Sequence, residues 1–174
     1  MEQSVAEMVE LIDKIAEEHR TTLERIESLG NVANDVEAMA GLEKTANTFM
    51  PDRLDEKEGL RKMYQLLEKI IEGLNDHFYR EETRLLEGVE KHGDERMAKA
   101  LETLLSQHKD LRDRFAKTQE HISELTTGGM AKHRWRASAQ DMRAYLAKTS
   151  RDLETHAHHE QELLMSLRRQ LVKD

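Results

Sequence analysis

Apolar side chains recur at steps of three and four residues along four long segments, the period expected of helices with one buried face. They are Val5, Met8, Ile12, Ile15, Leu23 and Ile26, then Leu60, Met63, Leu67, Ile70, Leu74 and Leu85, then Met97, Leu101, Leu104, Leu111, Phe115, Ile122 and Leu125, and finally Met142, Leu146, Leu153, Leu164, Leu167 and Leu171. Few runs of β-branched residues could form strands between them. The pattern therefore predicts an all-α fold.

Short stretches with turn chemistry separate the four segments. They lie at residues 41–54, 92–94 and 126–129, and Ser138 is the expected cap of the last helix. Short connections make consecutive helices antiparallel, as in an up-down-up-down four-helix bundle. Because the sequence shows no long linker and no repeat that can be aligned, we expect one domain over residues 1–174.

Each apolar series has a gap near its middle, and a histidine occupies every gap. These residues are His19, His77, His108 and His156, and a glutamate follows two of them by one helical turn, Glu81 after His77 and Glu160 after His156. One histidine on an apolar face is usually a core residue with satisfied hydrogen bonds. Four such gaps, two of them followed by a glutamate, favour a cation site instead, because burying two carboxylates without a cation would be costly.

The positions of the histidines along the helices test this interpretation. His77 lies 16 residues before Gly93 in the predicted turn, and His108 lies 15 residues after it. At about 1.5 Å of rise per residue, a mismatch of one residue is small. Similar comparisons across the other turns, with Ser138 as the start of the fourth helix, place all four histidines in one layer of the bundle. A fourth helix that starts nearer Met130 would only extend beyond the others.

Imidazole and carboxylate ligands together suit iron, manganese or zinc, whereas calcium and magnesium prefer oxygen ligands. Six ligands are too many for one tetrahedral zinc ion. They divide naturally over two ions, with His19 and His77 on one, His108 and His156 on the other, and both glutamates as bridges. About two of six octahedral positions on each ion would stay open. On paired iron, such positions favour dioxygen, nitric oxide or peroxide as ligands.

The ordered set H, HxxxE, H, HxxxE resembles the hemerythrin-like HHE cation-binding family. It is formed here by His19, residues 77–81, His108 and residues 156–160, so the resemblance covers nearly the whole chain. Membership would imply a hemerythrin-like four-helix bundle. It would also imply a non-haem centre of two iron ions per chain with carboxylate bridges.

Two positions depart from the oxygen-carrying members of that family. Arg112 stands where those members have a second histidine after the third-helix ligand, and Glu160 stands where their last motif usually ends in an aspartate at longer spacing. The ligand set looks more like bacterial di-iron proteins linked to repair of iron centres after nitrosative or oxidative stress. It is also similar to the iron- and oxygen-sensing domain of an F-box protein. The resemblance thus implies handling or sensing of O2, NO, peroxide or iron.

Several polar residues lie near the predicted ligands without belonging to the set. His159, one turn from the last histidine ligand, could fill an open iron position, although we favour a surface location. His158 and Glu162 form another HxxxE pair, but this pair lies off the apolar face. Glu18 and Glu82 are expected to be solvated.

Composition narrows the choice of partners and location. The net charge of −8 argues against nucleic acid, because phosphate binding requires clustered Lys and Arg. The sequence has no cysteine, which excludes thiol chemistry and fits a reducing compartment. No apolar run reaches the 18 residues of a membrane span, and the acidic start MEQSVAEMVE is unlike a secretion signal. We therefore expect a cytoplasmic protein.

Two other functions stay open on the sequence. A metal-free helical bundle could act as an interaction module, with the histidines as pH-sensitive core residues. A ferritin-like di-metal oxidase is the other alternative. Such a site needs a glutamate from each of two helices and Glu-x-x-His on the other two. Because the motifs here begin with histidine and use four-residue spacing, we rank the ferritin-like site below the hemerythrin-like one.

Overall fold

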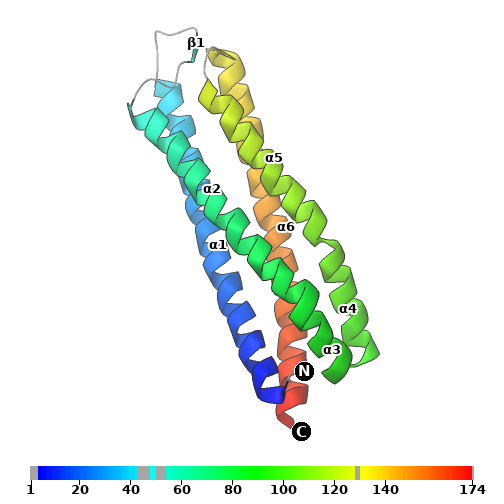
Figure 1. Ribbon diagram of the computed structural model, residues 1–174. Coiled ribbons are helices and arrows are strands. Elements are labelled where there is room, and N and C mark those ends of the chain that lie inside the picture. Colours follow the sequence, from blue (N-terminus) through cyan, green and yellow to red (C-terminus); the bar gives the residue numbers. More distant parts are fainter. Residues whose placement is uncertain (1–3, 43–47, 50–53, 128–129, 174) are drawn as a thin grey trace.

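The computed structural model describes residues 4–42, 48–49, 54–127 and 130–173, and it confirms the all-α fold. Four antiparallel rods form an elongated bundle (Figure 1). They are α1 (Val5–Leu42); α2 (Leu54–Arg80) with the π-helical turn η1 (Glu81–Leu85) and α3 (Leu86–His92); α4 (Glu95–Ser106) with α5 (His108–Thr127); and α6 (Lys132–Lys173). Helix α1 packs against α2 and α6, and α5 packs against the same two helices.

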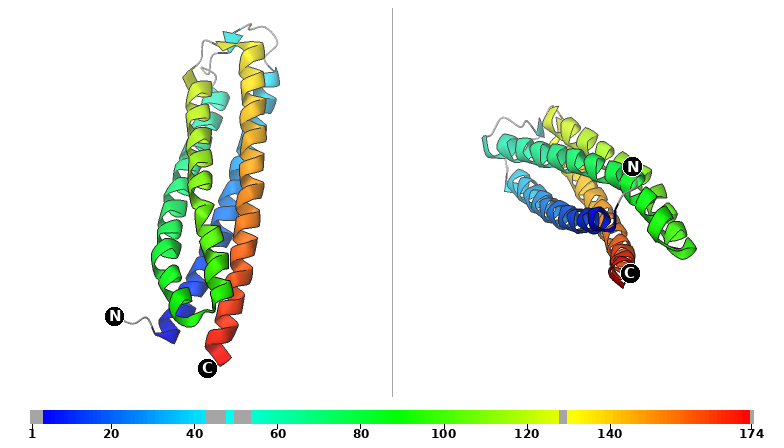
Figure 2. Two further views of the ribbon diagram at one scale, coloured as in Figure 1. Left: turned by 90° about the vertical axis from the view of Figure 1, so that its right-hand side faces the viewer. Right: turned by 60° about the horizontal axis from the view of Figure 1, so that its bottom comes forward.

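The predicted break at residues 92–94 is confirmed. Helix α3 ends at His92, and the side chain of Asp94 accepts a 2.8 Å hydrogen bond from the backbone N–H of Met97 in the first turn of α4. This is a helix N-cap, which satisfies a backbone donor that has no partner inside the helix. The start of α1, the end of α6 and the α3–α4 turn lie at the same end of the bundle (Figure 2).

A pair of two-residue strands joins the two turns at the opposite end. Strand β1 (Thr48–Phe49) pairs antiparallel with β2 (Met130–Ala131), so Thr48 is opposite Ala131. The sequence did not predict this pair, because two residues are too few to show an alternating pattern. The rest of the predicted break at 41–54, apart from its two helix ends, lies outside the described residues, as do residues 128–129 of the other break.

The prediction that the last helix begins at Ser138 was wrong, because α6 begins at Lys132. Trp135 explains the earlier start. Its side chain is fully buried, and its indole N–H donates a 3.0 Å hydrogen bond to the carbonyl of Leu125. Ser138 lies inside the helix, with its hydroxyl 3.2 Å from the ring of His121. The helix therefore extends beyond the expected cap without moving its later residues to another height.

Two apolar cores fill the bundle, one toward each end. The core on the β1–β2 side includes Ile26, Leu67, Leu74, Phe115, Trp135 and Leu146, and the core on the side of the chain ends includes Met8, Ile15, Leu85, Leu101, Leu104 and Leu164. The four predicted gaps fall between these cores. None of the described helices combines the length and apolar content that crossing a membrane requires.

Candidate metal centre

The six residues predicted as ligands meet in one layer between the two apolar cores. His19 comes from α1, His77 from α2, Glu81 from η1, His108 from the start of α5, and His156 and Glu160 from α6. Both glutamates are fully buried, and His19 has the most exposed side chain of the six at 11%. Four separate rods thus contribute to one buried polar cluster.

Glu81 directs its two oxygens to different histidines. Its Oε1 contacts Nε2 of His77 and lies 3.6 Å from Nε2 of His19. Its Oε2 lies 2.8 Å from Nε2 of His108. Neighbouring ligand atoms bound at about 2.1 Å to one first-row metal ion are about 3 Å apart. The contacts of Glu81 therefore have the spacing of a carboxylate shared by two ions.

Glu160 repeats this arrangement from the opposite side. Its Oε1 lies 3.4 Å from Nε2 of His19, and its Oε2 lies 3.2 Å from Nε2 of His156. Each glutamate consequently presents one oxygen to each pair of histidines. Two overlapping groups result, in each of which the ligand atoms lie within 4.8 Å of one another: His19, His77, Glu81 and Glu160 in one, and Glu81, His108, His156 and Glu160 in the other.

The polar atoms that face the inside of this layer have the chemistry of a cation site. The Nε2 atoms of all four histidines and both oxygens of each glutamate are buried and have no hydrogen-bond partner among the described residues. Buried polar atoms without partners are costly, and a cation would satisfy all of them together. Imidazole and carboxylate donors also match the preference of divalent first-row metals. The residues present therefore fit a metal centre.

The comparison with protein-family models gives a match to the hemerythrin HHE cation binding domain over residues 10–167. The chain belongs to this family. Searches of curated proteins and of solved structures each gave no match. Members of the HHE family bind metal cations, and in this HHE domain the buried layer of histidines and glutamates is a cluster that can hold metal.

Two histidines of this HHE domain are held by hydrogen bonds on their outer nitrogens. Nδ1 of His108 lies 2.9 Å from Oε1 of Glu82, and Nδ1 of His156 lies 2.8 Å from Oε1 of Gln107. An acceptor at Nδ1 places the proton there and leaves Nε2 free to bind a metal. Glu82 and Gln107 therefore orient both rings toward the inner layer.

The expectation that Glu18 and Glu82 are solvated was wrong, because both are half-buried and contact other side chains. Glu18 pairs with Arg80, whose Nε donates to it at 3.0 Å, and it lies 3.8 Å from Nδ1 of His77. Glu82 pairs with Arg112 at 3.1 Å. Solvation was expected because sequence spacing shows which helix face a residue occupies but not whether a neighbouring rod covers it.

A sequence signal for these outer residues does exist. Glu18 directly precedes the ligand on α1, Glu82 directly follows Glu81, and Gln107 directly precedes His108. A residue next to a buried ligand lies at the edge of the apolar stripe, where two helices meet. A polar side chain at that position can reach across to a histidine of the adjacent rod.

Two of the four rods are irregular at this layer, which the sequence did not predict. In η1 the N–H of Leu86 donates to the carbonyl of Glu81, five residues back, which widens the helix by one residue at the ligand. In the third rod α4 ends at Ser106, and the N–H of Gln107 donates to Leu104, three residues back, at 3.1 Å. π-helical turns inside helices are frequent at functional sites.

Arg112 does not point into the buried layer of candidate ligands. Its guanidinium binds Glu82 and lies 5.1 Å from the ring centre of Phe78. Phe78 in turn stacks on His108, with ring centres 3.8 Å apart. The long side chain therefore covers the apolar ring of Phe78 while its charge pairs with an acid.

Burial controls the protonation of the cluster. It raises the pKa of Glu81 well above the usual carboxyl range, and the neighbouring charge of Glu160 raises it further. Burial opposes ionisation of Glu160 too, but its close contacts with Glu81, His156 and His19 lower its pKa below the usual range. Burial also lowers the pKa of His108 to about 4, despite the opposing effect of Glu82. His108 is thus neutral near pH 7, the form that binds metals.

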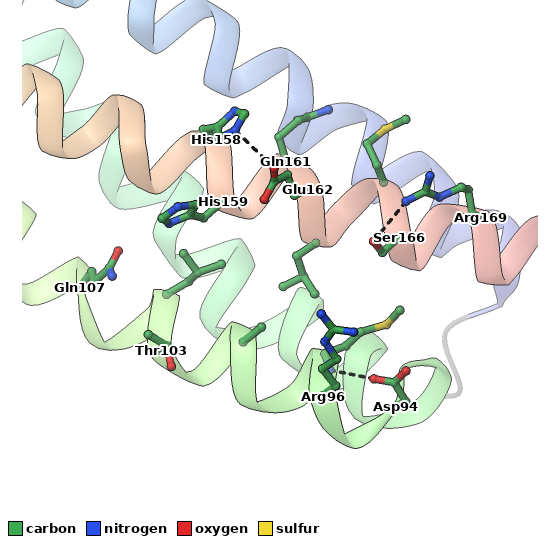
Figure 3. A pocket seen from close by; sticks show the side chains of 15 residues that line it. Asp94, Arg96, Thr103, Gln107, His158, His159, Gln161, Glu162, Ser166 and Arg169 are labelled. Carbon is green, nitrogen blue, oxygen red and sulfur yellow. Dashed lines mark hydrogen bonds and ion pairs between the residues drawn. The ribbon is translucent and has the colours of Figure 1, made fainter.

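A groove of about 830 Å³ between α4 and α6 lies outside this layer. His158 and His159 line it together with Gln107, as Figure 3 shows. His158 is exposed and pairs with Glu162 at 3.3 Å, so this HxxxE pair lies off the core as predicted. His159 is exposed as well, and it belongs to neither group of possible ligands among the described residues.

Proposed function

We propose that the chain is a di-iron protein in which His19 and His77 hold one ion and His108 and His156 hold the other. Glu81 and Glu160 would bridge the two ions. The observation that supports this most directly is that each glutamate presents one oxygen to each histidine pair. Four of these oxygen–Nε2 distances are between 2.8 and 3.6 Å. A site for a single ion would not need two carboxylates that each face both pairs of histidines.

The protein residues hold the ions and limit what can reach them. Glu82 and Gln107 fix two of the imidazoles, and the apolar cores on both sides exclude bulk water. A cavity of about 10 Å³, the size needed for one water molecule, adjoins His19, His77 and His156. Its other walls are mostly apolar, so it suits a small neutral ligand and not a larger substrate.

A bound iron pair with open positions supplies redox chemistry toward small oxidants and diatomic ligands. We therefore propose that the chain handles or senses O2, NO, peroxide or iron itself, as in stress response or repair of iron centres. The presence of Arg112 and its contact with Glu82 favour this over reversible oxygen transport, because no third imidazole comes from that position. A cytoplasmic location is part of the same proposal.

Metal analysis of protein purified without oxygen tests the proposal. We expect about two irons per chain, near-ultraviolet charge-transfer bands after oxidation, and a magnetically coupled pair in Mössbauer spectra. If the analysis finds two manganese or zinc ions per chain, the proposed site holds but the proposed metal does not. A colourless, folded protein that binds no metal would instead favour a metal-free interaction module.

A further inference from the structure

The outer nitrogens of the four histidines are held unequally on the two sides of the centre. On one side, Nδ1 of His108 and Nδ1 of His156 each have an acceptor within 2.9 Å, Glu82 and Gln107 respectively. Both lengths lie within the range of a hydrogen bond. Both rings on this side are therefore fixed by a partner from a neighbouring rod.

On the opposite side, no described residue makes such a hydrogen bond to either histidine. Nδ1 of His77 lies 3.8 Å from Glu18, which is too far for a hydrogen bond. The carboxylate of Glu18 instead accepts a hydrogen bond from Nε of Arg80 at 3.0 Å. Nδ1 of His19 is buried, and no described residue accepts a hydrogen bond from it. His19 is also the most exposed of the six predicted ligands.

An outer hydrogen bond affects how strongly a histidine holds its metal. It fixes the orientation of the ring and makes the inner nitrogen more basic, and its loss typically lowers metal affinity by about 10- to 100-fold. Release of an ion begins when one ligand rotates away. A ring whose Nδ1 is hydrogen-bonded resists this rotation, whereas a ring without such a hydrogen bond does not.

We infer that the two ions exchange at different rates, with the ion between His19 and His77 as the exchangeable one and the ion between His108 and His156 as the retained one. This inference rests on the proposed two-iron centre. It makes Glu82 and Gln107 positioning residues for the retained ion, acting through the histidines that they contact. The chain could then give up or accept one iron while keeping the other.

Chelation kinetics test the inference without any assay of activity. The protein is loaded with ferrous iron under argon to two ions per chain and mixed with an excess of a chelator that becomes coloured on binding Fe(II). We expect two phases of equal amplitude, with rates that differ by about tenfold or more. Magnetic or Mössbauer spectra after the first phase should show a single uncoupled ion per chain.

Two glutamates provide a matched pair of variants to assign the phases. Glu18 and Glu82 are both half-buried, both next to a predicted ligand in sequence, and both paired with an arginine. Glu82→Ala should accelerate the slow phase by about 10- to 100-fold, whereas Glu18→Ala should leave it unchanged. Glu82→Gln keeps an acceptor for His108 and should give an intermediate rate.

Gln107→Ala gives an independent test if Glu82→Ala does not fold. Gln107 is exposed at the edge of the α4–α6 groove (Figure 3), so its truncation removes little packing. It too should accelerate the slow phase. Release of both irons in one phase, or acceleration of the slow phase by Glu18→Ala alone, would overturn the inference. A chain that never takes up two irons would overturn the proposed function itself.

Discussion

Removing the metal should lower the thermal stability of this protein strongly. Without a cation, four imidazole nitrogens and four carboxylate oxygens face one another in a buried layer, and no described residue hydrogen-bonds to them. The two glutamates are fully buried there, and burial raises the pKa of Glu81, so its charged form is disfavoured in this layer. Metal ions that bind only the folded chain shift the folding equilibrium toward it.

The size of the effect follows from mass action. An ion present at 100 times its dissociation constant adds about 2.7 kcal/mol to the free energy of unfolding, so two ions add about 5 kcal/mol. For a chain of 174 residues, each kcal/mol moves the melting temperature by about 2–4 °C. Metal-loaded protein should therefore melt about 10–20 °C above chelated protein.

Two histidines of the same helix separate metal binding from general effects of substitution. His156→Ala removes a buried predicted ligand, whereas His158→Ala, two residues further on, removes an exposed ring whose contact is with Glu162 at 3.3 Å. We expect His156→Ala to reduce the metal-dependent shift by about half, because one of the two proposed ions would lose an imidazole. His158→Ala should retain the full shift.

Melting curves followed by circular dichroism, with metal content verified for each sample, provide the measurement. If wild-type protein melts at the same temperature with and without metal, the buried layer is not a metal site. Equal loss of the shift in His156→Ala and His158→Ala would also refute the reasoning, because only one of these side chains lies in the core layer.

Four further predictions concern single positions. Glu160→Gln should retain iron but weaken the magnetic coupling between the ions, and a normally coupled pair in its Mössbauer spectra would contradict the bridging role. Gly30→Ala should raise the free energy of unfolding in urea by about 0.5–1 kcal/mol, since nothing lies within 4 Å of the added carbon in this helical position. Gly88→Ala should lower it by about 1–3 kcal/mol, because its added carbon would lie 2.2 Å from the sulfur of buried Met8; equal effects of the two substitutions would refute this packing argument. Arg112→His should prolong the life of the oxygenated protein after exposure to air, and an unchanged autoxidation rate at equal iron content would show that residue 112 does not reach the centre.

The sequence alone predicted the four helical rods and the six candidate metal ligands of the buried layer. Helical periodicity is a local property, so a histidine or glutamate in an apolar stripe is visible without any knowledge of the neighbouring helices. The prediction that the four histidines lie at one height followed from counting residues on each side of a turn, because the rise per residue of a helix is constant. The wrong start of the last helix at Ser138 did not disturb that match, because α6 begins earlier and still carries His156 at the same height.

Tertiary structure decided how this layer is supported. Whether Glu18, Glu82 and Gln107 face solvent or a neighbouring histidine depends on the rotation of adjacent rods and on side-chain rotamers, neither of which spacing along one helix determines. The π-helical turn at Glu81 and the interruption before His108 likewise appear where the packing of four rods must place ligands on one plane. The unequal support of the two histidine pairs is therefore a property of the assembled bundle, because it arises from contacts between helices that are far apart in sequence.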